Sequence, residues 1–189
     1  MKEVQVDVSR CVGCKSCEIA CAVEHSESKE LFGALFEDVL PRKRVFVQAA
    51  GECSVPVNCR HCEEAFCVRV CPTGAMYRDE ASGTVQHNSH RCIGCGFCEL
   101  ACPFGAIARN QGSKVVVKCD CCPDRETPAC VSACPTQALL YMTPEETQRR
   151  KLRSLAEQMC LPGKQKSDAG CRMPDVGCRK FHELPDVVL

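Results

Sequence analysis

Tryptophan is absent from the 189-residue sequence, and aromatic residues make up only 5% of it. Few large apolar side chains are therefore available for a core, and small cores usually need disulfides or metals as further support. No stretch reaches the roughly 18 apolar residues that indicate a membrane span. Residues 1–8 alternate valine with charged or polar residues and lack the apolar region of a secretory signal. We therefore expect a cytoplasmic chain with no direct membrane span and with reduced thiols.

An excess of charge of either sign is also missing. Lysine and arginine together number 24, as do aspartate and glutamate, so the formal net charge is zero. Nucleic-acid-binding domains usually carry a basic surface, so we expect no nucleic-acid partner. The sequence has no glycine-rich nucleotide loop of the G-x-G-x-x-G type and no clear acid–base pair. We therefore expect a non-catalytic component rather than a self-contained enzyme.

Cysteine, in contrast, is abundant, with 21 residues, far above the level of an ordinary soluble protein. Sixteen of these cysteines form four runs: Cys11-x2-Cys14-x2-Cys17-x3-Cys21, Cys59-x2-Cys62-x4-Cys67-x3-Cys71, Cys92-x2-Cys95-x2-Cys98-x3-Cys102 and Cys119-x2-Cys122-x7-Cys130-x3-Cys134. Every run ends in the same x3 step, and a proline follows runs two, three and four. The pattern is an internal repeat, which indicates related local structures.

Short segments of strand-like sequence precede three of the runs. Valine alternates with polar residues over residues 4–8, before run one, and residues 84–86 and 115–117 precede runs three and four. The x3 step of each run suits a short helix. We therefore predict an α+β fold, with short strands and helices around the runs and a core that ends near residue 142.

The sequence changes in character after residue 142. Thr143 is predicted to cap a helix, with Pro144 at its first position and Glu146 completing a capping box. Apolar residues then recur at helical spacing, at Leu152, Leu155, Ala156 and Met159, before a stop at Pro162-Gly163. We predict two regions: a core over residues 1–142, and a C-terminal helix with a loop-rich tail over residues 143–189.

The spacing of the runs indicates iron–sulfur chemistry, because a cubane cluster needs soft thiolate ligands from a compact loop. The run C-x2-C-x2-C-x3-C-P is the bacterial ferredoxin pattern, whose fourth cysteine ligates the other cluster of a pair. Runs one and three match this cysteine spacing, and run three has the proline as well. Four runs predict four [4Fe–4S] clusters as cofactors.

Structural zinc is the alternative, because Cys-x2-Cys pairs often hold zinc. Zinc would leave the third and fourth cysteines of each run unexplained. A disulfide framework would need an oxidising compartment. A zinc-binding scaffold that transfers no electrons is therefore the rival hypothesis from another class.

The runs resemble the four-cluster ferredoxin-type electron-transfer subunits of anaerobic oxidoreductases, the iron–sulfur subunit family of dimethyl sulfoxide reductase, formate dehydrogenase and formate hydrogenlyase. The resemblance covers residues 2–142 and depends on the segments Cys59-Arg60-His61-Cys62-Glu63, Cys71-Pro72-Thr73-Gly74-Ala75, Lys118-Cys119-Asp120 and Cys130-Val131-Ser132-Ala133-Cys134-Pro135-Thr136. Residues 17–26 most resemble the carbon monoxide dehydrogenase iron–sulfur subunit. The resemblance implies a tandem, bacterial-ferredoxin-like fold of two dicluster units.

The resemblance also implies which cysteines share a cluster, since in this family runs one and four pair, runs two and three pair, and each pair exchanges its last cysteine. The implied ligands are Cys11, Cys14, Cys17 and Cys134 for cluster 1; Cys59, Cys62, Cys67 and Cys102 for cluster 2; Cys92, Cys95, Cys98 and Cys71 for cluster 3; and Cys119, Cys122, Cys130 and Cys21 for cluster 4. Each cluster would cross-link distant segments, so metal binding would supply folding free energy.

Several residues near the runs have two interpretations. Cys121 competes with Cys122 for a ligand position, and the spacing favours Cys122. His61 either hydrogen-bonds a cluster sulfur or is a surface histidine, and Lys118 either offsets thiolate charge or is a solvated cation. The cysteines outside the ligand sets are interpreted as unligated thiols rather than as a further metal site: Cys53, Cys121, Cys160, Cys171 and Cys178.

The predicted function is electron transfer through four clusters between a catalytic redox subunit and a hydrogenase or other acceptor. Carbon monoxide dehydrogenase is the first candidate for the catalytic partner. The iron–sulfur subunit of a formate dehydrogenase, a formate hydrogenlyase or another molybdopterin oxidoreductase is the alternative within this class. The redox chemistry would belong to the cofactors, and the protein would position and tune them.

Overall fold

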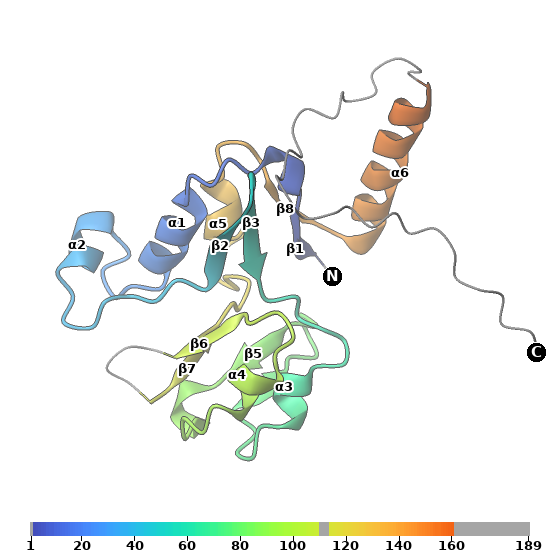
Figure 1. Cartoon of the computed structure of the whole chain (residues 1–189). Coiled ribbons are helices and arrows are strands. Elements are labelled where there is room, and N and C mark those ends of the chain that lie inside the picture. Colours follow the sequence, from blue (N-terminus) through green and yellow to red (C-terminus); the bar gives the residue numbers. More distant parts are fainter. Residues whose placement is uncertain (1, 110–113, 161–189) are drawn as a thin grey trace, which may run out of the picture. The chain divides into compact units, whose positions relative to one another are not determined.

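The computed structural model describes residues 2–109 and 114–160. The chain divides into a compact unit up to Arg149 and a second unit from Arg150 onward. The elements, drawn in Figure 1, follow one another as β1 (Glu3–Val6), η1 (Val8–Arg10), α1 (Ser16–Glu24), α2 (Leu31–Leu35), β2 (Val45–Ala50), β3 (Cys53–Asn58), α3 (Phe66–Arg69), β4 (Met76–Arg78), β5 (Val85–His87), η2 (Ser89–Arg91), α4 (Phe97–Ala101), β6 (Ile107–Arg109), β7 (Val116–Lys118), α5 (Ala129–Ser132), β8 (Leu139–Met142) and α6 (Pro144–Cys160).

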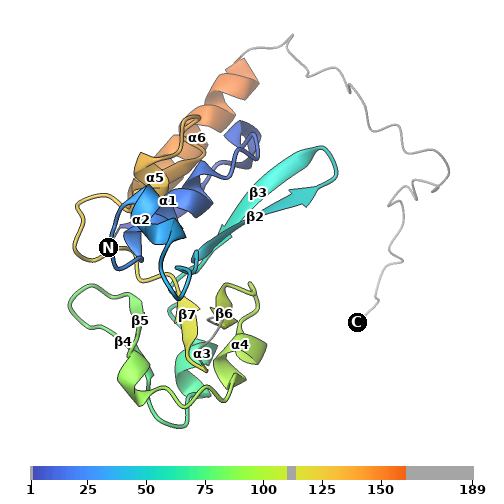
Figure 2. The ribbon, with the colours of Figure 1, turned by 90° about the vertical axis from the view of Figure 1, so that its left-hand side faces the viewer.

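The strands form four separate antiparallel pairs: β1 with β8, β2 with β3, β4 with β5, and β6 with β7. The β1–β8 pair joins segments that are far apart in the sequence, with Val4 opposite Tyr141 and Val6 opposite Leu139. The other three pairs are hairpins between consecutive strands, and β2 and β3 form the longest of them (Figure 2). The mixture of short strands and helices agrees with the predicted α+β class.

Most of the predicted local structure is confirmed, with one correction at the N-terminal strand. The expected strands before runs three and four are β5 and β7. Val8, predicted to continue the first strand, lies instead in the short helix η1. The reason is a tight turn, in which the amide of Arg10 donates to the carbonyl of Asp7 and the amide of Cys11 donates to that of Val8. The β2–β3 hairpin was not predicted from the sequence.

A short helix carries the third cysteine of every run, as the x3 steps predicted. These helices are α1, α3, α4 and α5, which hold Cys17, Cys67, Cys98 and Cys130 respectively. The helices α1 and α5 lie side by side, as Figures 1 and 2 both show. Runs one and four are therefore neighbours in space.

The core of the first unit is small and rich in cysteine. One cluster of buried residues contains Val4, Val45 and Leu139 together with four cysteines: Cys17, Cys21, Cys121 and Cys130. A second cluster combines Met76, Ile107 and Val116 with Cys98. Apolar burial contributes about 25 cal/mol per Å², so few large side chains give limited stabilisation. The low aromatic content of the sequence therefore corresponds to two small buried clusters that contain few large side chains.

Helix α6 begins with the capping box that the sequence predicted. The amide of Thr143 donates to Glu146 Oε2 at 2.8 Å, and the amide of Glu146 donates to Thr143 Oγ1 at 3.2 Å. The predicted apolar stripe of this helix is exposed at Leu152, Leu155 and Met159. The predicted stop at Pro162-Gly163 and the loop-rich tail lie outside the described residues. Within the described part of the chain, no helix is both long enough and apolar enough to span a membrane.

Replacing Thr143 with alanine should weaken the start of α6, because the amide of Glu146 would lose its acceptor, Thr143 Oγ1. Loss of such a cap typically costs about 1 kcal/mol. Hydrogen exchange of the first-turn amides should become faster in Thr143→Ala and should stay near the wild-type rate in Thr143→Ser, which keeps the hydroxyl. Equal exchange in all three proteins would show that the box does not stabilise the helix.

Candidate metal centres

Three cavities of the structure are each lined by four cysteines. In every case three cysteines come from one run and the fourth ends another run. The sets are Cys11, Cys14, Cys17 and Cys134; Cys59, Cys62, Cys67 and Cys102; and Cys71, Cys92, Cys95 and Cys98. The structure thus brings together the same groups that the family resemblance implied for clusters 1, 2 and 3.

The fourth predicted group is brought together between α1 and the loop of run four. Burial raises the pKa of the Cys130 thiol, which also lies near enough to those of Cys119, Cys21, Cys122 and Cys17 for their charges to raise it further. All of these except Cys119 are buried. The Sγ atom of Cys21 also accepts a hydrogen bond from the amide of Arg44 at 3.2 Å. The four predicted thiols are therefore neighbours, contributed by two runs that are distant in the sequence.

The residue before the second cysteine of each run has a left-handed backbone conformation. Its φ is +70° at both Gly13 and Gly94, +46° at His61 and +65° at Cys121. This conformation turns amides toward the thiols, as in other backbone concavities that hold anions. The amide of His61 donates to Cys59 Sγ at 3.5 Å, and the amide of Cys121 donates to Cys119 Sγ at 3.4 Å. Glycine adopts the conformation without strain, whereas His61 and Cys121 do not.

The last cysteine of two runs accepts further amide hydrogen bonds. Cys71 Sγ accepts from the amide of Met76 at 3.5 Å, and Cys134 Sγ accepts from that of Ala138 at 3.2 Å. These bonds outweigh the effect of burial and lower the pKa of both thiols. Thiolates accept hydrogen bonds better than thiols do, so these backbone groups favour the form that binds metal.

Four other thiols have raised pKa values, because burial disfavours the charged thiolate. Burial raises the pKa of Cys17, Cys98 and Cys122 to about 11 each, and raises that of Cys130 further. Without a bound metal these groups are therefore protonated at neutral pH. Metal binding to them must release protons, which couples affinity to pH.

Asp120, in the loop of run four, is the centre of a half-buried polar network. Its carboxylate accepts hydrogen bonds from His25 Nε2 at 3.2 Å, from the amide of Cys122 at 3.0 Å, and from the guanidinium of Arg44. Burial alone would raise the pKa of Asp120, but these donors hold it well below the usual range. Burial lowers the pKa of His25, but its bonds to Asp120 and Cys21 outweigh this and raise it to about 10. The network joins the end of α1, the start of β2 and run four.

Two other charged side chains are buried beside the runs. Glu18, in α1, accepts from the amide of Val47 at 2.6 Å and from Lys43 Nζ at 2.5 Å. Lys118 is only 3% exposed, and its ammonium donates to the carbonyls of Val85 and Cys119. The interpretation of Lys118 as a solvated surface cation is therefore wrong, because two carbonyls from separate segments replace water around it.

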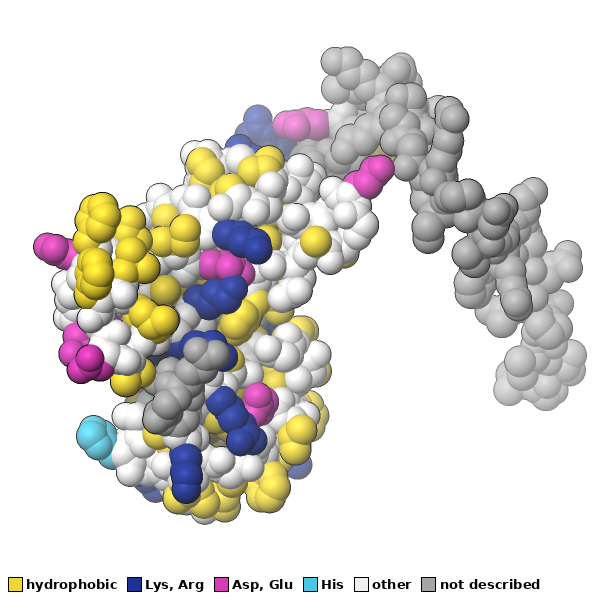
Figure 3. All heavy atoms as spheres, turned by 60° about the vertical axis from the view of Figure 1, so that its left-hand side comes forward, with side chains coloured by type: hydrophobic (Ala, Val, Ile, Leu, Met, Phe, Trp, Pro, Cys, Tyr) yellow, Lys and Arg dark blue, Asp and Glu magenta, His cyan; other side chains and the backbone are white. Residues whose placement is uncertain are grey.

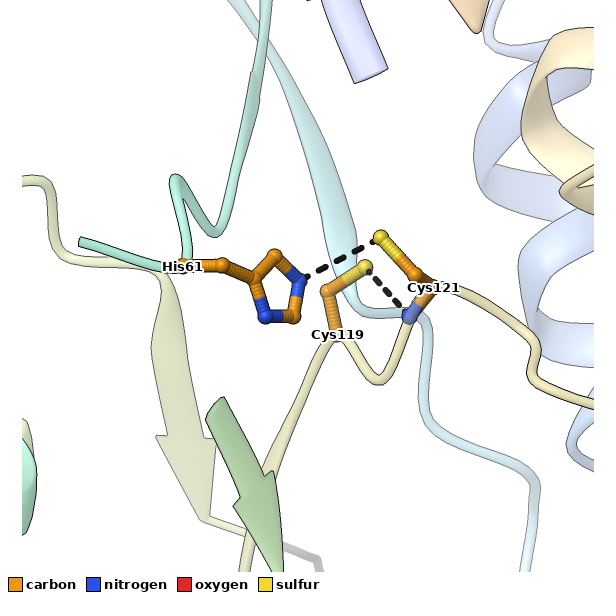
Figure 4. A group of neighbouring side chains, drawn as sticks. All are labelled: His61, Cys119 and Cys121. Atoms are coloured by element: carbon orange, nitrogen blue, oxygen red, sulfur yellow. Dashed lines mark hydrogen bonds between the residues drawn. The ribbon is translucent and has the colours of Figure 1, made fainter. Parts of the chain in front are cut away.

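The interpretation of His61 as a surface histidine is also wrong, since the residue is 5% exposed. Its Nδ1 accepts a hydrogen bond from the amide of Val85 at 3.0 Å, and its Nε2 lies 3.4 Å from Cys121 Sγ (Figure 4). The imidazole therefore connects run two with β5 and run four.

The cysteines outside the four groups have different environments. Cys53 and Cys160 are exposed, whereas Cys121 is buried. Cys171 and Cys178 lie outside the described residues. Every cysteine that the structure describes is a free thiol, so a disulfide framework is absent from that part of the protein.

Comparison with known proteins identifies the family. Residues 52–143 match a 4Fe-4S dicluster domain, and residues 8–24 match a 4Fe-4S binding domain. The electron transport protein HydN of Escherichia coli (strain K12) is 40% identical, over 80% of this sequence and 91% of its own length. The thiosulfate reductase electron transfer subunit PhsB of Salmonella typhi is 42% identical, over 75% of this sequence and 76% of its own. The B subunit of the anaerobic dimethyl sulfoxide reductase of Escherichia coli (strain K12) is 37% identical, with coverages of 83% and 80%.

Among solved structures, a component of the benzoyl coenzyme A reductase complex BamBC matches with a TM-score of 0.44 and 23% identity, over 84% of this protein and 91% of that component. The family assignment depends on the sequence matches alone.

The sequence matches show that the protein belongs to the family of 4Fe–4S electron-transfer subunits of anaerobic oxidoreductases. It binds [4Fe–4S] clusters, and a complement of four is consistent with its size and its cysteine content.

The residues around the cavities fit such clusters. Each of the three cavities offers four soft thiol ligands, the donor set that [4Fe–4S] clusters require. His87 is one of the residues that line the cavity of Cys71, Cys92, Cys95 and Cys98, and its Nε2 is buried without a hydrogen-bond partner among the described residues. Buried polar atoms are rarely left unpaired, and the sulfurs of a cluster are acceptors. The unpartnered nitrogen is therefore consistent with a cluster in this cavity.

Replacing Asp120 with asparagine should destabilise the protein, because Arg44 and His25 would lose the carboxylate that compensates their charges. Removing one partner of a fully buried ion pair costs about 3–5 kcal/mol, and partial exposure of Asp120 reduces the expected cost to about 2 kcal/mol. The midpoint of thermal unfolding, followed anaerobically by circular dichroism, should fall by several degrees. The exposed Asp124→Asn in the same loop is the control, and an equal midpoint in both variants would contradict this role.

Cluster assembly should become more favourable as the pH rises from about 7 to about 8.5, because buried thiols with raised pKa values must lose their protons to bind iron. Anaerobic reconstitution with iron and sulfide in weak buffer would be followed by visible absorbance and by the protons released per protein molecule, after subtraction of those that the added sulfide itself loses on entering the cluster. The remaining proton release, which comes from the thiols, should decrease as the pH approaches the thiol pKa values. No remaining proton release at neutral pH would show that the thiols are already ionised.

Proposed function

We propose that this protein is a non-catalytic electron conduit, carrying four [4Fe–4S] clusters in two dicluster units. The observation that supports this most directly is the grouping of the sixteen cysteines into four sets, each drawn from two runs. Bound clusters would supply one-electron transfer at potentials that the protein adjusts. The core over residues 1–142 would hold the clusters, and residues 143–189 would form an appended region.

The proposed ligands are the sets implied by the family resemblance. Runs one and four would form one dicluster unit, because α1 lies beside α5 and β1 pairs with β8. Runs two and three would form the other, since Cys71 and Cys102 each line the cavity of the opposite run. The protein's own contribution is to hold the thiols in place and to direct amides at their sulfurs.

The proposed partner is a catalytic oxidoreductase subunit, as the names of the relatives PhsB and the dimethyl sulfoxide reductase B subunit suggest. Carbon monoxide dehydrogenase is the first candidate, with formate dehydrogenase, formate hydrogenlyase or a hydrogenase as the alternative. An exposed apolar patch supports association with another protein. It surrounds α2, where Phe32 is 76% and Phe36 84% exposed, and it appears as a yellow group in Figure 3. Patches of this kind commonly mark protein interfaces.

The proposal includes a cytoplasmic location, since cluster ligands must stay reduced and the cytoplasm keeps thiols reduced. The test of the function begins with anaerobically purified full-length protein. Iron and acid-labile sulfide should each be present at about sixteen per protein molecule, four per cubane cluster. The protein should also co-purify with a redox enzyme and accept electrons from it. Bound zinc with little sulfide would overturn the proposal in favour of a zinc scaffold.

Replacing Cys95 with serine should remove or convert one cluster, because Cys95 lines the cavity of the third set and serine is a poorer ligand for iron. Iron per protein molecule should fall by about one if the cluster becomes [3Fe–4S] and by about four if it is lost. Cys53→Ser is the matched control, since Cys53 is exposed and outside every set. A loss of iron in the Cys53 variant, or none in the Cys95 variant, would show that the ligand sets are wrong.

A further inference from the structure

His61 and Cys121 occupy equivalent positions in two different runs and touch one another. Each residue comes directly before the second cysteine of its run, and each has a left-handed backbone. Runs one and three have glycine at this position. A residue with a side chain is strained in this conformation, and such strain is often retained where the side chain has a role. The contact therefore requires an explanation beyond the turn itself.

The hydrogen bond that His61 accepts fixes which atom is the donor in the contact between His61 and Cys121. The amide of Val85 donates to His61 Nδ1, which leaves the proton of the neutral ring on Nε2. Nε2 then donates to Cys121 Sγ at 3.4 Å (Figure 4). A sulfur that accepts from the imidazole keeps its own S–H proton available for another acceptor.

The candidate acceptor is the sulfur of Cys119, whose pKa is lowered by its interaction with Cys121. The amide of Cys121 already donates to Cys119 Sγ at 3.4 Å, and the Sγ atoms of both cysteines lie within 4.8 Å of each other and of a ring nitrogen of His61. His61 and Cys121 are only 5% and 7% exposed. Hydrogen bonds in such a water-poor environment are strengthened, and successive bonds polarise one another. Figure 4 shows the three side chains gathered at this point.

We propose that Cys121 is not an iron ligand but a positioned hydrogen-bond donor that, held by His61, stabilises negative charge on the ligand sulfur of Cys119 and raises the reduction potential of cluster 4. The inference rests on the proposed function, because it assumes that Cys119 ligates a cluster. Hydrogen bonds to ligand sulfurs favour the more negative, reduced state of a cluster. Cys122 is then left as the second ligand of run four.

The contact also links the two proposed dicluster units. His61 belongs to the loop of run two, and Cys121 belongs to the loop of run four. The buried ammonium of Lys118 lies in the same region and bonds the carbonyls of Val85 and Cys119. The tuned sulfur therefore lies at the junction between the units, where electrons would pass from one pair of clusters to the other.

The test uses full-length, cluster-loaded protein and the variants Cys121→Ala and Cys121→Ser. Both replacements keep a Cβ atom, so the backbone strain at this position is the same as in the wild type. Iron and sulfide per protein molecule would be measured first, followed by redox titration monitored by electron paramagnetic resonance. The alanine variant should keep about sixteen iron atoms. One of its four midpoint potentials should fall while the other three stay unchanged.

The serine variant separates hydrogen bonding from packing. A hydroxyl is a stronger donor than a thiol, so the potential that falls in Cys121→Ala should stay at or above the wild-type value in Cys121→Ser. The exposed Cys53→Ala is the control and should leave all four potentials unchanged.

Three results would overturn the inference. Loss of a cluster in Cys121→Ala with retention in Cys122→Ser would make Cys121 the ligand. Four unchanged potentials in the alanine variant would exclude tuning, and a fall in the serine variant equal to that in the alanine variant would assign the effect to packing. Wild-type protein without four clusters would instead contradict the proposed function itself.

Discussion

The convergence of thiols from distant segments is the constraint on which the rest of this structure depends. The strands are short, the pairs of strands are isolated from one another, and the buried apolar clusters are small. Isolated two-stranded hairpins are only marginally stable in water. Metal–thiolate bonds supply the missing stabilisation in small domains of this kind, since binding free energy becomes folding free energy. The polar network of Asp120 and the buried Glu18 then fix the orientation of the loops that present the cysteines.

Much of this arrangement could be predicted from the sequence, because the chemistry is encoded in local spacing. The x3 steps predicted the short helices, and the Thr143–Glu146 capping box predicted the start of α6. The ligand sets required the family resemblance, since spacing within one run does not identify the run that completes it. That the four cysteines of each set ligate one cluster stays a prediction.

The features that were not predicted depend on contacts between segments. Lys118 and His61 are polar residues in cysteine-rich loops, and nothing in their local sequence indicates burial. Both are buried because Val85, in β5, supplies a carbonyl to the first and an amide to the second. The β2–β3 hairpin was missed for a related reason. It contains Pro56 and ends in exposed residues near Gly51, so its alternation of apolar and polar residues is weak.

The pairing of β1 with β8 has a consequence for the order in which segments of the protein can fold during synthesis. In the proposed ligand sets runs two and three form a pair that lies between runs one and four in the sequence, so all cysteines of this pair would be present once residue 102 has been synthesised. In the proposed sets run one would wait for Cys134, and β1 waits for residues 139–142, with which it pairs. The N-terminal segment is therefore synthesised first but is among the last to pair with its partner segments. Until Cys134 is synthesised, the thiols of run one would therefore lack the fourth member of their proposed set.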